Sequence, residues 1–243
     1  MKTITVLLGL SSVTLSAQDA NLARMLDNKL SVSQRNDACY ALRGGRTPEA
    51  VAAFVSGLES PDVRSCAARN LREAGAVEQL RAALNTPDPD IRATATRELG
   101  ALMKPELMDV LAKTARDPNL TVATSAFQAL SNYQDRAVLP YLLELADAGG
   151  MVAAMALSRA VEFADPSIVA VARRLMASRD IPLRLAALRA IGDLGDSTDL
   201  PALRVLANKA ESAAPGGRGF GLVPTLDLSR AAQNAILQIR GRS

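Results

Sequence analysis

Residues 61–71 read PDVRSCAARNL, and residues 89–100 read PDIRATATRELG. In each, an Arg is followed three positions later by Ala and four positions after that by an aliphatic residue. The phrase occurs four times, as Arg35-Ala38-Leu42, Arg64-Ala67-Leu71, Arg92-Ala95-Leu99 and Arg184-Ala187-Ile191. The first three Arg residues are 29 and 28 positions apart, and the gap of 92 to the fourth holds three repeats. A fixed period of this size is typical of stacked helical pairs.

Each repeat is predicted to contain an outer helix, A, and an inner helix, B. The B helices carry the repeated phrase, begin after short Pro/Asp turns and end near a glycine, which commonly caps a helix. The A helices are expected at residues 48–58, 77–84, 105–115, 137–146, 166–177 and 201–210. The sequence therefore predicts an all-α fold, a right-handed α-solenoid of about six helical-hairpin repeats.

The two middle repeats are degenerate. Ala123 replaces the Arg in the fourth repeat and Ala154 replaces it in the fifth, although the apolar face survives in both. We expect these repeats to be joined more loosely. A Gly/Pro-rich loop at residues 211–225 interrupts the array, and a final helix at residues 228–239 is expected to cap it.

The first 17 residues resemble a signal peptide. Lys2 supplies a positive start, an apolar stretch follows, and cleavage after Ala17 would leave a repeat domain of residues 18–243. The alternative is a first core helix. No later segment is predicted to span a membrane. We therefore expect an exported protein, periplasmic or extracellular.

The composition restricts the possible chemistry. Histidine is absent, which removes the commonest general base and metal ligand. The net charge is only +3 and aromatic residues make up 3%, so a nucleic-acid surface with stacking platforms is not expected. The carboxylate pairs Asp88/Asp90 and Asp193/Asp196 fall in turns, where Asp caps helices. We expect no cofactor, no metal site and no catalytic residues.

The phrases at residues 61–71, 89–100 and 183–192 resemble the HEAT-repeat superfamily, in particular the short HEAT-like repeats first described in phycobilisome lyases. The resemblance covers roughly residues 28–210. It implies a scaffold or binding surface, because that is what most of the family supplies, and fold alone does not define function.

The repeated Asp and Arg residues have two interpretations. The resemblance implies a ladder that bridges neighbouring repeats, and the alternative is a basic groove for an acidic partner. An Arg next to the core face can pack its stem while its guanidinium reaches a neighbouring repeat. The ladder candidates are Asp62, Arg64, Asp90, Arg92 and Arg184.

The two cysteines are candidates for a disulfide. Cys39 follows the core residue Ala38 and Cys66 precedes the core residue Ala67, so their side chains leave opposite flanks of successive B helices. In a right-handed solenoid these flanks face each other, and contacting helices lie about 8–10 Å apart. The alternative is a pair of reduced, buried small residues.

The sequence favours non-enzymatic binding of a protein or peptide partner by a monomer. Exposed positions of the B helices are candidates for partner contacts, and the Gly-rich loop is either a connector or a recognition loop. The candidates are Arg69, Arg72, Arg97, Glu98, Arg189, Arg218 and Phe220. Two other classes remain open: an enzyme or enzyme accessory resembling phycobilin lyases, and a nucleic-acid-binding HEAT-like protein.

Overall fold

The computed structural model describes residues 17–208 and 228–242. Every regular element over those ranges is helical, which confirms the all-α fold class. Residues 1–16 of the expected signal peptide, the loop at residues 211–225, and Arg218 and Phe220 within that loop lie outside the described residues. The chain divides into two compact units, one ending at Ala82 and the other beginning at Ala83.

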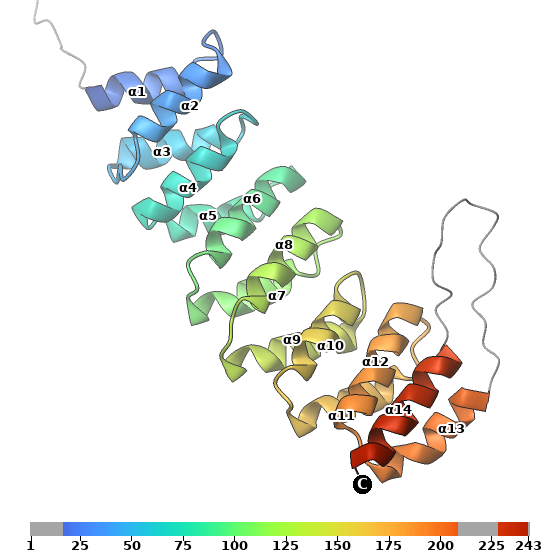
Figure 1. Cartoon of the computed structure of the whole chain (residues 1–243). Coiled ribbons are helices and arrows are strands. Elements are labelled where there is room, and N and C mark those ends of the chain that lie inside the picture. The colour runs from blue at the N-terminus through green and yellow to red at the C-terminus, as the bar shows by residue number, and fades with distance from the viewer. Residues whose placement is uncertain (1–16, 209–227, 243) are drawn as a thin grey trace, which may run out of the picture. The chain divides into compact units, whose positions relative to one another are not determined.

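Unit 1 contains antiparallel helix pairs at the N-terminal end of the repeat region. Helix α1 packs against α2, α3 packs against α4, and α1 also contacts α3 (Figure 1). The repeat period does not predict α1, which supplies the first repeat with an A helix. The helices are α1 (Ala17–Leu26), α2 (Val32–Ala41), α3 (Pro48–Gly57), α4 (Arg64–Ala74) and α5 (Val77–Ala83), the last of which crosses the boundary.

Local sequence explains the helix ends in unit 1. Ser31 begins α2 with a capping box, in which its side chain accepts from the N–H of Gln34 and the Gln34 side chain accepts from the Ser31 N–H. Thr47 caps α3, whose first residue is Pro48. Gly75 ends α4 at φ 76°, a left-handed conformation that favours glycine. These short signals explain why the helix positions are predictable from the sequence.

Unit 2 continues the same alternation of A and B helices. The A helices α7, α9, α11 and α13 pack on the B helices α8, α10, α12 and α14 respectively (Figure 1). Short 3₁₀ turns at Pro105–Leu107, Arg136–Val138 and Ser197–Asp199 lead into three of the A helices. The helices are α6 (Pro89–Gly100), α7 (Met108–Thr114), α8 (Leu120–Ser131), α9 (Leu139–Ala148), α10 (Ala153–Val161), α11 (Pro166–Leu175), α12 (Ile181–Leu194), α13 (Leu200–Asn208) and α14 (Leu228–Arg242).

Small residues allow close approach between some B helices of unit 2. A Cβ built on Gly100 of α6 would lie 2.4 Å from the Cβ of Ala129 in α8. A Cβ on Gly192 of α12 would lie 3.1 Å from the Cα of Ala235 in α14. Both glycines stand eight positions after the repeated Arg. Glycine is required there because any side chain would separate the two helices.

Candidate partner-binding groove

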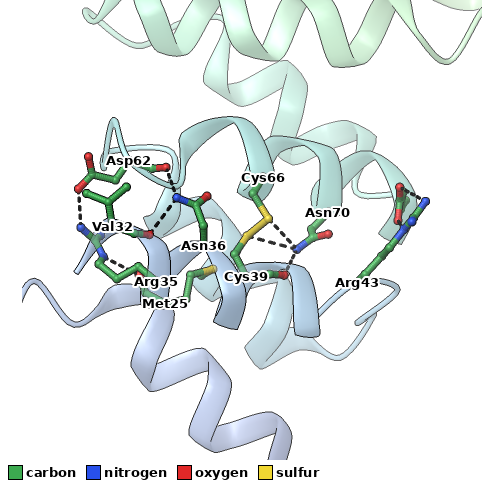
Figure 2. The surroundings of a disulfide bond; sticks show 10 residues. Met25, Val32, Arg35, Asn36, Cys39, Arg43, Asp62, Cys66 and Asn70 are labelled. Carbon is green, nitrogen blue, oxygen red and sulfur yellow. Dashed lines mark hydrogen bonds and ion pairs between the residues drawn. A yellow bond between two sulfur atoms is a disulfide. The ribbon is translucent and has the colours of Figure 1, made fainter. Parts of the chain in front are cut away.

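A disulfide joins Cys39 of α2 to Cys66 of α4, at a Cα–Cα distance of 6.3 Å (Figure 2). Both cysteines are buried. The side-chain amide of Asn70, one turn after Cys66, donates to the carbonyl of Cys39 at 3.0 Å and lies 3.6 Å from the Cys39 sulfur. The bond therefore lies inside unit 1, where it connects the B helices of two successive repeats.

Polar contacts flank this disulfide on both sides (Figure 2). Arg35 donates from Nη1 to Asp62 Oδ2 at 2.9 Å, and the Asn36 side-chain amide donates to the Asp62 carbonyl at 3.0 Å. At the other end of α2, Arg43 Nε donates to Glu73 Oε2 at 2.9 Å. The guanidinium of Arg43 holds the pKa of Glu73 below its usual value, mainly through this hydrogen bond. Unit 1 thus joins its repeats by one covalent bond and two ion pairs.

The repeated Arg has a role that the sequence pattern did not reveal. In three repeats its Nε donates to a carbonyl in or next to the last turn of the preceding A helix: Arg35 to Met25, Arg64 to Leu58 and Arg184 to Met176, at 3.1, 2.7 and 3.1 Å. The last carbonyls of a helix have no partner within it. The Arg therefore closes the A helix of its own repeat, and Arg35 also pairs with Asp62 just before the next B helix.

Arg92 shows the inter-repeat contact of unit 2 most clearly. Its Nε and Nη2 donate to the two carboxylate oxygens of Asp117 at 2.8 and 3.0 Å, and Nη1 donates to the carbonyls of Thr86 and Pro87. This two-point pair is strong and geometrically specific. The hydrogen bond from Arg92 lowers the pKa of Asp117 against the opposing effect of burial. Asp90, the acid expected in the ladder, lies exposed in the first turn of α6.

The spacing of the B helices in unit 2 is uneven. Helix α6 packs closely along α8, as α10 does along α12, whereas α8 and α10 have few backbone contacts within the described residues. Position 123 of α8 has Ala in place of the repeated Arg, and Ser131 stands where α6 and α12 have glycine. Arg159 of α10 bridges the wider gap, because its Nε donates to the carbonyl of Ser131 at 3.2 Å and its Nη2 to that of Tyr133 at 3.1 Å.

An open groove of about 720 Å³ lies over this wider gap. Helix α10 lies between α8 and α12 along the stack, and all three helices line the groove. Its volume is within the range of ligand sites, about 300–1,000 Å³. Met155 of α10 is 40% exposed there, and Met side chains adapt to different apolar surfaces. The lining residues are Phe127, Ser131, Ala154, Met155, Ser158, Arg159, Val161, Glu162, Pro182, Leu185, Ala186, Arg189 and Asp193.

The charged lining residues gather toward the C-terminal ends of α10 and α12. The side chain of Arg159 is only 11% exposed and donates to Glu162 at 2.7 Å. It also lies over the ring of Phe163, 4.8 Å from the ring centroid. Arg189 is different, because its side chain is 80% exposed and its Nε is 3.9 Å from Asp193. The groove therefore has an apolar N-terminal part and a charged C-terminal part.

The candidate residues from sequence lie in several places. Arg69 is exposed on α4 in unit 1, where Arg72 lies half-buried 4.0 Å from Glu73. Arg189 lies in the groove of unit 2.

Two further candidates lie on α6 and do not line the groove. Arg97 is exposed and donates to Thr94 Oγ1 at 2.9 Å, whereas Glu98 is half-buried. Sequence reasoning missed Phe127, Met155 and Leu185, although the loss of Arg at position 123 marked the repeat where the groove forms.

The helix pairs define an α-solenoid repeat protein. Residues 77–158 match the family model described as HEAT repeats, which confirms the expected HEAT-type repeats in that part of the chain. A search of curated proteins finds no match.

The solved structures that are similar to this chain include the following three, all of low sequence identity. Human deoxyhypusine hydroxylase in complex with glycerol is 18% identical over 92% of this chain and 96% of that chain, with a TM-score of 0.41. The complex of CpcE and CpcF of phycocyanin lyase from Nostoc sp. PCC7120 is 20% identical over 98% and 92%, with a TM-score of 0.38. An engineered protein is 17% identical over 94% and 98%, with a TM-score of 0.32.

Among the described residues, no helix is long and apolar enough to cross a membrane. No group of three or more Cys, Asp or Glu side chains in the same residues is arranged to hold a metal ion.

Proposed function

We propose that this chain is an exported, non-catalytic repeat scaffold that binds a protein or peptide partner through the groove on α8, α10 and α12. The observation that carries the proposal is the groove itself, an apolar concavity at the point where two B helices are spread. Exposed apolar surface next to a few placed charges is typical of a binding site.

Export is supported by the N-terminal segment and by the disulfide. Disulfides persist in oxidising compartments and are rare in the cytosol. The Cys39–Cys66 bond is buried and connects two repeats, so an oxidising environment would stabilise unit 1. Cell fractionation followed by intact-mass measurement tests this part, and we expect an oxidised protein that begins at Gln18. Recovery of the full-length, reduced chain from the cytosol would contradict it.

The binding function is tested by capture from the native envelope with mature protein and two variants. Leu185→Glu places a charge in the groove, and Val205→Glu places the same charge at an exposed apolar position on α13. We expect a stoichiometric partner to be lost with Leu185→Glu and kept with Val205→Glu. Chemical cross-links between the chain and its partner should involve residues of α10 or α12. A partner that both variants retain would show that binding uses another surface.

A further inference from the structure

Neighbouring repeats of unit 2 meet in two layers, one formed by the A helices and one by the B helices. In the B layer, α6 packs along α8, α10 along α12 and α12 along α14, whereas α8 and α10 share few backbone contacts within the described residues. In the A layer, α9 contacts both α7 and α11, so contact between the A helices continues past this point. The backbone contacts at the step from α8 to α10 therefore lie mainly on its A side.

The helices on the two sides of this step form two groups, α6–α8 and α9–α14, that resist bending inside themselves. In the first group, Gly100 of α6 meets Ala129 of α8 so closely that no further methyl fits between them. In the second group, Gly192 of α12 meets Ala235 of α14 in a similar way. Interlocked surfaces of this kind do not deform continuously. Bending of unit 2 should therefore concentrate at the step between the groups.

Arg159 joins the two groups across the B layer. It lies on α10, and its Nε donates to the carbonyl of Ser131, the last residue of α8, at 3.2 Å. Its Nη2 donates to the carbonyl of Tyr133 at 3.1 Å and to Oε1 of Gln134 at 3.2 Å, both in the turn after α8. Glu162 accepts from Nη1 of Arg159 at 2.7 Å and orients the guanidinium from its own repeat.

The turn that receives Arg159 is itself fixed to the first group. The side chain of Tyr133 is buried, and its hydroxyl donates at 2.9 Å to the carbonyl of Lys104, in the turn between α6 and α7. The acceptors of Arg159 therefore move with α6–α8, while the guanidinium moves with α9–α14. Bending that spreads α8 and α10 would separate the donor from its acceptors, so Arg159 limits opening.

Apolar side chains act on the opposite movement. Phe127 lines the groove from α8 and Met155 lines it from α10. Bringing the two helices together removes apolar surface from water, which favours closing until the side chains meet. The width of the groove therefore depends on the angle between the two groups of helices.

We propose that unit 2 has a hinge between α8 and α10, which widens and narrows the groove, and that Arg159 is the latch that limits its opening. Closure or opening of two rigid bodies about a few residues is a common form of conformational change. The proposal goes beyond the binding function, because it concerns the free chain and requires no partner. It would stand even if capture from the envelope returned no partner at all.

Distances between pairs of spin labels, measured by pulsed electron paramagnetic resonance, test the hinge. Labels on Gln128→Cys of α8 and Ser158→Cys of α10, both at exposed positions, report on the step. The native disulfide is kept intact, and because its cysteines are buried it does not react with the label.

Two control pairs lie inside the groups and also use exposed positions: Arg97→Cys with Gln128→Cys, and Ser158→Cys with Arg189→Cys. We expect the distance distribution across the step to be about twofold wider than either control distribution, because rigid bodies move about the hinge and not within themselves. Equal widths for all three pairs would overturn the hinge, since the solenoid would then bend uniformly or not at all.

The latch is tested in the same three labelled pairs. Arg159→Ala should shift the distances across the step to larger values and leave both control distributions unchanged, which also shows that the repeats remain folded. Arg174→Ala is the matched control variant, because Arg174 pairs with Asp147 between α11 and α9, inside the second group. It should leave all three distributions unchanged. Distances across the step that do not change in Arg159→Ala would overturn the role of Arg159.

Discussion

The two units use different means to hold neighbouring B helices together. In unit 1, α2 and α4 share few backbone contacts and are connected by a disulfide and by the Arg35–Asp62 and Arg43–Glu73 pairs. In unit 2, α6 with α8 and α12 with α14 approach through glycine and alanine. Both arrangements carry the same Arg-Ala-aliphatic phrase, so the phrase specifies the helix pair and not how pairs are joined.

One sequence position differs between these helices, although it does not fix the spacing alone, because α10 has Glu162 there and still packs closely along α12. Eight residues after the repeated Arg, unit 1 has Arg43 and Arg72, whereas unit 2 has Gly100 and Gly192. A long charged side chain keeps the neighbouring helix at a distance and forms ion pairs, while glycine allows backbone contact. Ser131 occupies this position in α8, next to the gap that the groove covers.

The largest expected effect is that of removing the disulfide. Replacing both Cys39 and Cys66 by Ala should destabilise unit 1 by about 2–4 kcal/mol, because the closed loop no longer restricts the unfolded chain. Hydrogen exchange should rise in α2 and α4 and stay unchanged in α8, α10 and α12. An equal rise throughout the chain would show that the bond does not act on unit 1 alone.

A somewhat smaller effect is expected from filling the glycine contact of unit 2. Gly100→Ala should destabilise unit 2 by about 1–3 kcal/mol, because the new methyl overlaps Ala129. Adding Ala129→Gly should recover part of the loss in a double-mutant cycle measured by denaturant unfolding. Gly241→Ala in α14 meets no atom within 4 Å and should be neutral or slightly stabilising.

The Arg92–Asp117 pair predicts a dependence on pH that is specific to unit 2. The folded-state pKa of Asp117 is lowered by the hydrogen bond from Arg92, so the stabilisation is fully present above the unfolded pKa of about 3.9. It is lost as the pH falls from there through the folded pKa. Acid unfolding of unit 2 should depend less on pH in Asp117→Asn, and Asp109→Asn is an exposed control in the same unit. Identical acid transitions for the two variants would contradict this role.

The smallest effect is expected at the exposed Arg43–Glu73 pair. The side chain of Arg43 is 73% exposed, so solvent screens its charge and Arg43→Ala should leave the stability of unit 1 unchanged within error. The pKa of Glu73 should nevertheless rise toward its usual value, which NMR titration of the carboxylate can measure. A loss of stability comparable to that of the cysteine variant would contradict this expectation and show that the pair stabilises unit 1 as much as the disulfide does.

The sequence predicts the helices well because each repeat carries its own start and stop signals. Asp88-Pro89 and Asp180 begin α6 and α12, and Gly75 ends α4. The expected helix at residues 105–115 begins instead as a 3₁₀ turn at Pro105–Leu107 and becomes α-helical at Met108. Such local differences arise because the last or first turn of a helix often tightens where bonds to the preceding turn are missing.

The groove was not predictable from the same signals. It depends on the distance between α8 and α10, which the repeated phrase does not specify, since α10 also lacks the Arg and the glycine and still packs closely along α12. In the sequence, Met155 and Phe127 look like ordinary apolar positions of a repeat. Their exposure depends on how far the neighbouring helix lies from them, and the sequence does not show that distance. Among the candidates on B helices, Arg189 was identified from exposure alone and lies in the groove.

The disulfide also has a consequence for how the chain matures. With two cysteines, the chain has a single intramolecular pairing available, so oxidation cannot trap an incorrect internal connectivity. An oxidant is sufficient, and a catalyst that reshuffles disulfides has no substrate within one molecule. The remaining wrong product is a covalent dimer between two chains. The yield of correctly oxidised protein should therefore depend on how dilute the newly made chains are.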